Sequence, residues 1–153
     1  MVQISLMPSA EAADLADDIR ELFDDLSRTL DRTQRAYSGE CHPALDVLET
    51  DEAIEVSADV AGVPPAALRV LFRAGVLLIV GEKAPGPAAS EQTFHLVERA
   101  FGRFARAVRL AGAFDLQNSR ATLHAGELTI VLPKIEDRRG RAHRIPITAG
   151  SRP

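Results

Sequence analysis

A chain of 153 residues is long enough to bury one hydrophobic core and too short for two ordinary domains, so one domain with terminal arms is expected. Aromatic residues make up 5% of the chain and Trp is absent, which predicts an aliphatic core and leaves few rings for stacking on bases or sugars. The net charge of -4 is unevenly spread, because residues 1–42 carry nine acids and four bases whereas residues 136–153 carry two acids and five bases. An acidic head and a basic tail favour contacts between subunits.

The N-terminal segment has no basic start and no long apolar run, and it carries acids from Glu11 onward. We therefore expect neither a signal peptide nor a membrane span, and a cytoplasmic protein. The single Cys41 excludes a disulfide within the chain and fits a reducing compartment. Oxidation would still allow it to cross-link two chains.

The first predicted element is an amphipathic helix from Ala10 to about Thr33 that starts after Pro8-Ser9. Its apolar residues recur every three or four positions, with acids between them: Leu15, Ile19, Leu22, Phe23, Leu26 and Leu30. A membrane-surface helix usually carries Lys and Arg on its polar side, so this one needs a protein partner. Either it packs on its own domain, or residues 1–42 form an arm that pairs with other subunits or with unfolded clients. Residues 34–41 are interpreted as a linker.

Short apolar runs separated by turn residues follow from Pro43, the pattern of an all-β, immunoglobulin-like β-sandwich over residues 43–135. In the second run, the apolar residues 54, 56, 58 and 60 alternate with polar ones, so one face of that strand should meet water. The fourth run, VLLIV, is apolar throughout and is predicted to be central. The predicted strands are 44–49, 53–60, 68–73, 76–80, 98–110, 121–123 and 127–132.

Three motifs resemble one family. Residues 121–134, ATLHAGELTIVLPK, predict a hairpin with a turn at His124-Ala125-Gly126 and a stop at Pro133, and they match A-x-L-x-x-G-x-L-x-I-x-L-P. Residues 98–110 match E-R-x-x-G-x-F-x-R-x-x-R-L, and Ile145-Pro146-Ile147 lies about twelve residues past Pro133. Together these features resemble the small heat-shock proteins of bacterial and plant type. The resemblance covers about residues 43–147, and it implies an α-crystallin domain with an N-terminal helical arm and a flexible C-terminal tail, residues 136–153.

Arg106 shares its parity with Phe104 and Val108, so it falls on the otherwise apolar side of its strand. A charge there needs a carboxylate or carbonyl partner, because an unpaired buried charge is costly. The alternative is an exposed arginine on a bulged strand. By resemblance, Arg106 is the family's strand arginine at the dimer interface, with Glu91 or Glu98 as its acid.

The segment between Lys83 and Phe94 contains two prolines and no apolar anchor, so it should be exposed. The resemblance implies that it carries an extra strand that crosses to a neighbouring subunit. The expected dimer interface therefore comprises Arg106, Glu91, Phe94 and Glu98.

The tail motif has two isoleucines that point the same way, since Pro146 between them keeps the backbone extended. Such a pair suits two apolar pockets. The resemblance implies that Ile145, Pro146 and Ile147 dock into a groove between two strands of another subunit. The expected groove residues are Leu68, Val70, Phe72, Ala121 and Leu123.

No catalytic residue, cofactor site or metal site is predicted, because the chain has no phosphate-binding glycine loop, no zinc spacing and no recognisable triad. The short basic tail lacks aromatics, so nucleic-acid binding has little support. The resemblance implies an ATP-independent holdase of the stress response. Its partners would be partly unfolded client proteins, its own copies as dimers and larger homo-oligomers, and ATP-dependent chaperones downstream.

Two other classes of protein stay open. A co-chaperone-like β-sandwich module would bind one folded chaperone as a monomer, without an exchange loop or a tail tripeptide. A small β-sandwich enzyme or ligand-binding domain would need a pocket with convergent polar groups.

Overall fold

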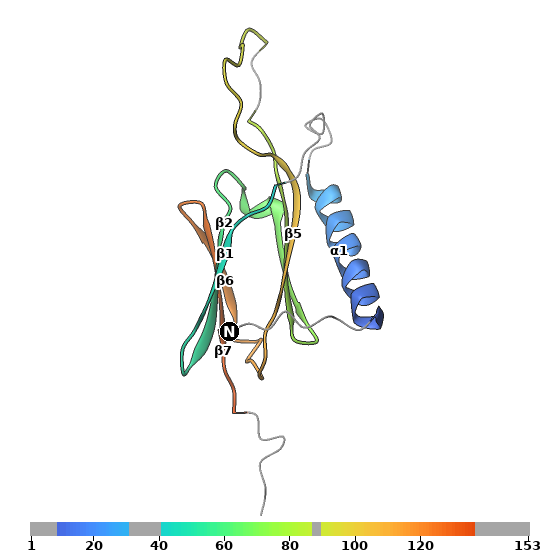
Figure 1. Cartoon of the computed structure of the whole chain (residues 1–153), viewed down its shortest axis with the longest axis vertical. Helices are drawn as coiled ribbons and strands as arrows, with labels where there is room; N and C mark the ends of the chain where they lie inside the picture. Colours follow the sequence, from blue (N-terminus) through green and yellow to red (C-terminus); the bar gives the residue numbers. More distant parts are fainter. Residues whose placement is uncertain (1–8, 31–40, 87–89, 137–153) are drawn as a thin grey trace, which may run out of the picture.

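The computed structural model describes residues 9–30, 41–86 and 90–136, and it has two antiparallel sheets packed face to face with one helix alongside (Figure 1). The four-stranded sheet has the order β1-β2-β7-β6 and the three-stranded sheet the order β3-β4-β5. All seven predicted strands are present, which confirms the all-β sandwich. The elements are α1 (Ser9–Thr29), β1 (Leu45–Glu49), β2 (Ala53–Asp59), the 3₁₀ turn η2 (Pro65–Ala67), β3 (Leu68–Arg73), β4 (Val76–Lys83), β5 (Gly102–Arg109), β6 (Arg120–His124) and β7 (Glu127–Pro133).

Several strand boundaries differ by one residue from those that the sequence predicted, and the largest differences are at the end of β4 and the start of β5. β4 continues to Lys83, and β5 begins at Gly102 rather than at residue 98, because these two residues are the last pair in the β4–β5 register. Beyond that pair the two strands separate into a long loop. β6 includes His124, so the hairpin turn consists of Ala125 and Gly126 alone.

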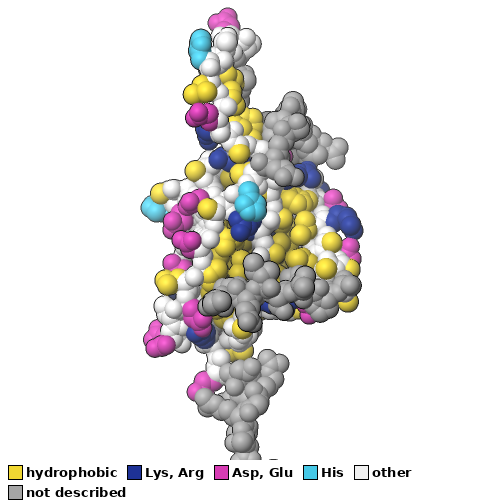
Figure 2. All heavy atoms as spheres, viewed as in Figure 1, with side chains coloured by type: hydrophobic (Ala, Val, Ile, Leu, Met, Phe, Trp, Pro, Cys, Tyr) yellow, Lys and Arg dark blue, Asp and Glu magenta, His cyan; other side chains and the backbone are white. Residues whose placement is uncertain are grey.

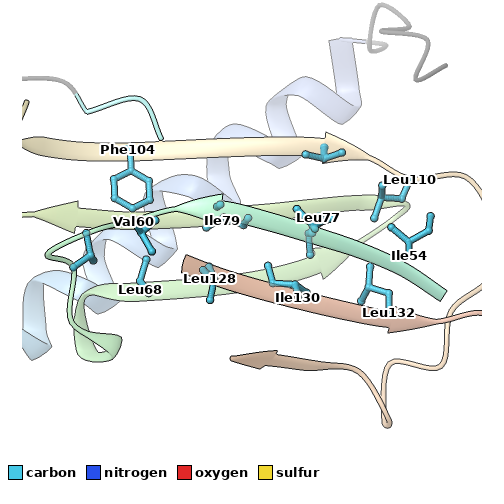
Figure 3. Packing of buried hydrophobic residues seen from close by; sticks show 14 of the residues in the cluster. Ile54, Val60, Leu68, Leu77, Ile79, Phe104, Leu110, Leu128, Ile130 and Leu132 are labelled. Carbon is cyan, nitrogen blue, oxygen red and sulfur yellow. The ribbon is translucent and has the colours of Figure 1, made fainter. Parts of the chain in front are cut away.

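The core lies between the two sheets (Figure 3). The alternation expected in the second strand is confirmed, since Ile54, Val56 and Ala58 on β2 are buried and Asp59 is exposed. The buried face continues onto the neighbouring strand, because Val56 pairs with Ile130 of β7, which is also buried. Aliphatic side chains make up nearly all of this core, as the composition predicted.

The strand β4 is buried on both faces. Leu77 and Ile79 point between the sheets and belong to the core cluster. Leu78 and Val80, which point the other way, form a second cluster beneath α1. The run VLLIV is therefore central, as predicted, and it is apolar throughout because each face of the strand has its own cover.

The helix α1 covers the outer face of the three-stranded sheet (Figure 1). Leu26 is only 1% exposed, and four further predicted apolar residues of the helix pack around the same cluster, together with Leu71 of β3: Leu15, Ile19, Leu22 and Phe23. The sixth, Leu30, packs against the core between the sheets. In this structure the helix thus packs on its own domain, which is the first of the two alternatives. Residues 34–40 of the predicted linker lie outside the described residues.

Two hairpins close through turns of two residues that both have positive φ. The turn Ala74-Gly75 has φ of 51° and 78°, and Ala125-Gly126 has φ of 49° and 82°. This is the type I′ geometry that matches the twist of the flanking strands, and it normally selects Asn or Asp before Gly. Alanine at the first position is strained, because its Cβ crowds the backbone in the left-handed region.

Replacing Ala125 with Asn is expected to raise the free energy of unfolding by about 0.5–1 kcal/mol, since Asn tolerates this conformation better. Urea denaturation measures the change. Ala111, which is exposed and lies outside the positive-φ set, supplies the control substitution Ala111→Asn. An equal gain at both positions would argue against turn strain.

Gly81 lies where β4 comes closest to its neighbours. A Cβ at this position would lie 2.4 Å from Phe104 Cζ and 2.9 Å from the Ala67 carbonyl oxygen. Gly81→Ala should therefore lower the free energy of unfolding by about 1–3 kcal/mol through overpacking. Gly86→Ala is the matched control, because its Cβ would meet nothing within 4 Å. Thermal unfolding of both variants tests this, and similar melting temperatures would contradict it.

Candidate docking surfaces

One side of the sandwich is closed by Arg106. Its Nη1 donates a hydrogen bond to the Pro43 carbonyl oxygen at 2.6 Å. Arg106 lies on β5, an edge strand of the three-stranded sheet, and Pro43 lies two residues before β1, an edge strand of the other sheet. The bond therefore joins these two edges. The remaining edge strands, β3 and β6, border the opposite side of the sandwich.

The partner of Arg106 is a carbonyl, one of the two kinds of group that the sequence allowed. Within residues 41–86 and 90–136, no ion pair joins Arg106 to Glu91 or Glu98. Both glutamates are exposed on the loop between β4 and β5. The role of these residues in a dimer interface stays a prediction.

The five predicted groove residues all lie on the inward faces of β3 and β6. Leu68 is part of the core cluster, and Phe72 and Leu123 pack against it. Leu123 and Ala121 pair with Leu128 and Ile130, which are buried, so register places both on the buried face. We call this set the β3–β6 edge: Leu68, Val70, Phe72, Ala121 and Leu123.

The β3–β6 edge is apolar and partly open to solvent. Val70 is 36% exposed although it shares the inward face with Leu68 and Phe72, and Ala121 is also exposed. Beneath them, the rings of Phe72 and Phe114 meet edge to face with centroids 5.6 Å apart. Two unpaired strand edges with exposed aliphatic side chains are suited to an extended, apolar segment of polypeptide.

The base of the C-terminal tail is held firmly. Lys134 Nζ donates hydrogen bonds to Glu49 Oε1 at 2.5 Å and to the Thr50 carbonyl oxygen at 2.7 Å. The hydrogen bond from Lys134, with its positive charge, lowers the pKa of Glu49. The tail therefore leaves the sandwich from a fixed point at the end of β7. The motif Ile145, Pro146 and Ile147 lies outside the described residues.

A second apolar surface lies on the loop between β4 and β5, which stands away from the sandwich (Figure 1). Phe94 and Leu96 are each 72% exposed and Val97 is 64% exposed. Figure 2 shows hydrophobic side chains along this loop. Residues 84–86 and 90–101 contain no strand. The predicted exchange strand would need the edge of a second subunit as its partner.

The sequence missed the polar contacts that hold α1 on the sheet. Arg69 Nε pairs with Asp25 Oδ2 at 2.6 Å, and Arg73 Nη1 with Asp18 Oδ1 at 3.2 Å. The sequence did contain a signal, because Arg69, Leu71 and Arg73 are two positions apart on β3 and therefore share its outward face. Recognising their partners required the position of the helix.

The described residues present two exposed apolar surfaces, the β3–β6 edge and the loop between β4 and β5. No group of three or more His, Cys, Asp or Glu in residues 9–30, 41–86 and 90–136 is arranged to hold a metal ion. No described helix is long and apolar enough to cross a membrane. Cys41 is a free thiol that packs against the core cluster. The fold and its exposed edges define an all-β sandwich with an open, apolar strand edge.

Comparison with known proteins gives the family. Residues 46–148 match the model of the Hsp20/alpha crystallin family. The chain therefore belongs to this family, whose members are stress chaperones rather than enzymes and are typically oligomers that bind client proteins. This confirms the resemblance to small heat-shock proteins.

Relatives and a solved structure agree with this assignment. Heat shock protein 16 of Schizosaccharomyces pombe is 29% identical over 120 residues, 77% of this chain and 84% of that protein. Spore protein SP21 of Stigmatella aurantiaca is 36% identical over 92 residues, 60% of this chain but only 54% of that protein. The structure of heat shock protein 16.0 from Schizosaccharomyces pombe superposes with a TM-score of 0.62 and 29% identity, covering 71% of this chain and 100% of that one.

Replacing Arg106 with Met should lower the free energy of unfolding by about 1–2 kcal/mol, because it removes a charge-assisted hydrogen bond and leaves the Pro43 carbonyl without this donor. Urea denaturation measures the loss. Arg20→Met is the control, since Arg20 and Asp17 form a pair in which both side chains are 71% exposed. Equal effects of the two changes would show that Arg106 does not tie the edges together.

Proposed function

We propose that this protein is an ATP-independent holdase that binds partly unfolded proteins and prevents their aggregation under stress. The supporting observation is the β3–β6 edge, where inward-facing aliphatic side chains remain partly exposed beside two unpaired strand edges. Burying one aliphatic side chain there is worth on the order of 1.5–3 kcal/mol before the cost of ordering the bound segment. Binding of this strength is reversible, as a holdase requires.

The proposed working unit is a dimer formed by exchange of the loop between β4 and β5. Support comes from Phe94, Leu96 and Val97, which form an exposed apolar surface on a projecting segment. Such surfaces on a monomer usually mark a protein interface. In the dimer the loop would pair with the edge of the partner subunit, and Arg106, Glu91 and Glu98 would lie near the contact.

Larger assemblies would form through the tail. Ile145 and Ile147 would occupy the β3–β6 edge of a neighbouring subunit, so the tail and an unfolded client would compete for the same surface. We further propose a cytoplasmic location and delivery of bound clients to ATP-dependent chaperones. The arm residues Leu15, Ile19, Leu22, Phe23, Leu26 and Leu30 would contribute to client or subunit contacts when α1 leaves the sheet.

The holdase proposal is tested by light scattering of a heat-labile client enzyme that is warmed without ATP while this protein is added at rising subunit ratios. Suppression of aggregation at near-equal ratios is expected, with an inert protein of similar size as control. No suppression, at temperatures where circular dichroism shows this protein still folded, would overturn the proposal and favour the monomeric docking module.

Replacing both Ile145 and Ile147 with Ala should shrink the particle toward dimers, because the tail loses the side chains that fill the edge. Val70→Glu should have the same effect from the other side of the contact, since it places a charge on the apolar edge while its 36% exposure lets the carboxylate reach water. Size-exclusion chromatography with light scattering gives the particle mass.

Leu48→Glu is the matched control for Val70→Glu. Leu48 is 58% exposed and lies on β1, at the other side of the sandwich. Its substitution should leave the particle mass unchanged. An unaltered mass in the tail variant and in Val70→Glu would contradict the tail-docking proposal. Suppression of client aggregation tests the holdase proposal independently.

A further inference from the structure

The outer face of the three-stranded sheet has an apolar centre and a basic rim. Leu78 and Val80 of β4, with Leu71 of β3, form the centre, and α1 covers them. The rim consists of four arginines on the two flanking strands, Arg69 and Arg73 on β3 and Arg103 and Arg109 on β5. We call this set the helix-binding face: Leu71, Leu78, Val80, Arg69, Arg73, Arg103 and Arg109.

Each rim arginine contacts a different part of α1. Arg69 and Arg73 pair with Asp25 and Asp18 along one side of the helix. On the other side, Arg109 Nη2 pairs with Glu11 Oε2 at 2.5 Å, at the first turn of the helix. Guanidinium groups thus flank the apolar centre on both sides, and carboxylates of the helix meet them.

The fourth arginine contacts the last third of the helix. Arg103 Nη2 donates a hydrogen bond to Ser27 Oγ at 3.1 Å, and its guanidinium lies over the Phe23 ring, 5.2 Å from the centroid. In Figure 2 hydrophobic side chains fill the seam between sandwich and helix, and charged side chains lie along its outer side. The face therefore recognises both the apolar stripe and the flanking groups of an amphipathic helix.

The ion pairs that hold α1 on the sheet are individually weak. The side chains of Arg73, Asp25 and Glu11 in these ion pairs are 53%, 51% and 46% exposed, and exposed pairs are screened by salt. Leu26 is the only residue among 10–30 that is fully buried. Most of the stability of a helix in a protein comes from tertiary packing of its amphipathic face, so α1 depends on these contacts. Detachment of α1 is therefore easier than opening of the sandwich.

We propose that the helix-binding face is a second client site, which takes acid-flanked amphipathic helical segments of partly unfolded proteins when α1 detaches. The inference rests on the holdase proposal and adds a site and a partner chemistry to it. The chemistry is given by α1 itself, which the face holds through apolar residues three or four positions apart with Asp and Glu beside them. The four arginines, of which Arg103 also has its Nε 3.7 Å from Glu82 Oε2, disfavour a basic segment.

The geometry separates this site from the β3–β6 edge. That edge offers unpaired backbone groups, which an extended segment satisfies. The helix-binding face lies over paired strands, so it offers side chains alone and suits a segment that has satisfied its own backbone as a helix. The two surfaces would therefore select different conformations of an unfolded chain.

The test uses the full chain and, as probe, a fluorescently labelled peptide of residues 9–30. Asp25→Arg in the chain sets two guanidinium groups against each other at Arg69 and should loosen α1, leaving the face open to the unchanged peptide. We expect about tenfold tighter peptide binding to this variant than to the wild-type chain, measured by fluorescence anisotropy. High salt should weaken that binding.

The charge-swapped variant with both Asp25→Arg and Arg69→Asp is the matched control. It restores the ion pair of α1 within the chain and sets a carboxylate against Asp25 of the peptide, so binding should fall to the wild-type level or below. A peptide with Leu15, Leu22 and Leu26 replaced by Ser should bind none of the three chains. Equal binding of the unchanged peptide to all three chains, or none to the Asp25→Arg chain, would overturn the proposal.

One further measurement separates the outcomes. A second copy of the Asp25→Arg chain carries the same arginine on its α1 and would set it against Arg69, so a second copy is disfavoured as the occupant of the face. Suppression of client aggregation by the Asp25→Arg chain at a lower temperature than by the wild type would support the assignment to clients, and suppression at the same temperature would contradict it. If the wild-type chain suppresses no aggregation at any temperature, the holdase proposal fails, whereas peptide binding still tests the face itself.

Discussion

The structure depends on the burial of β4 on both of its faces. Leu77 and Ile79 need a second sheet on one side, and Leu78 and Val80 need a cover on the other. An antiparallel sheet usually packs one face and leaves the other in water, so a central strand that is apolar throughout demands an additional layer. The helix α1 supplies it, and its acids meet the arginines that border the strand.

The two sides of the sandwich, where the edge strands lie, differ in how far they are closed. On one side, the bond from Arg106 to the Pro43 carbonyl joins β5 to the segment before β1. On the other, β3 and β6 leave Val70 and Ala121 partly exposed. An open apolar edge promotes aggregation unless something covers it, and this is the edge at which we propose that the tail and client segments bind.

Much of the sandwich was predictable because strand signals are local. The alternation in β2 and the Gly126 turn each depend on neighbouring residues, and the structure has both. The surface on which α1 packs was not predictable. Amphipathicity shows that one side of a helix is buried, but it does not identify the surface that buries it. The carbonyl partner of Arg106 was likewise beyond the sequence, because every residue offers a carbonyl and only the fold selects one. The predicted groove residues lie on the inward faces of their strands, because parity along β3 and β6 fixes the side on which each residue lies.

The two hydrophobic clusters explain how one small domain can open without losing its fold. The sixteen buried residues between the sheets form one cluster, and Leu26, Leu78 and Val80 form another beneath the helix. Departure of α1 would expose the second cluster and break ion pairs in which one side chain of each is about half exposed, while the core between the sheets and the strand registers stay intact. Local opening of this kind needs much less free energy than global unfolding. Detachment of α1 would therefore expose apolar surface while the sandwich stays folded.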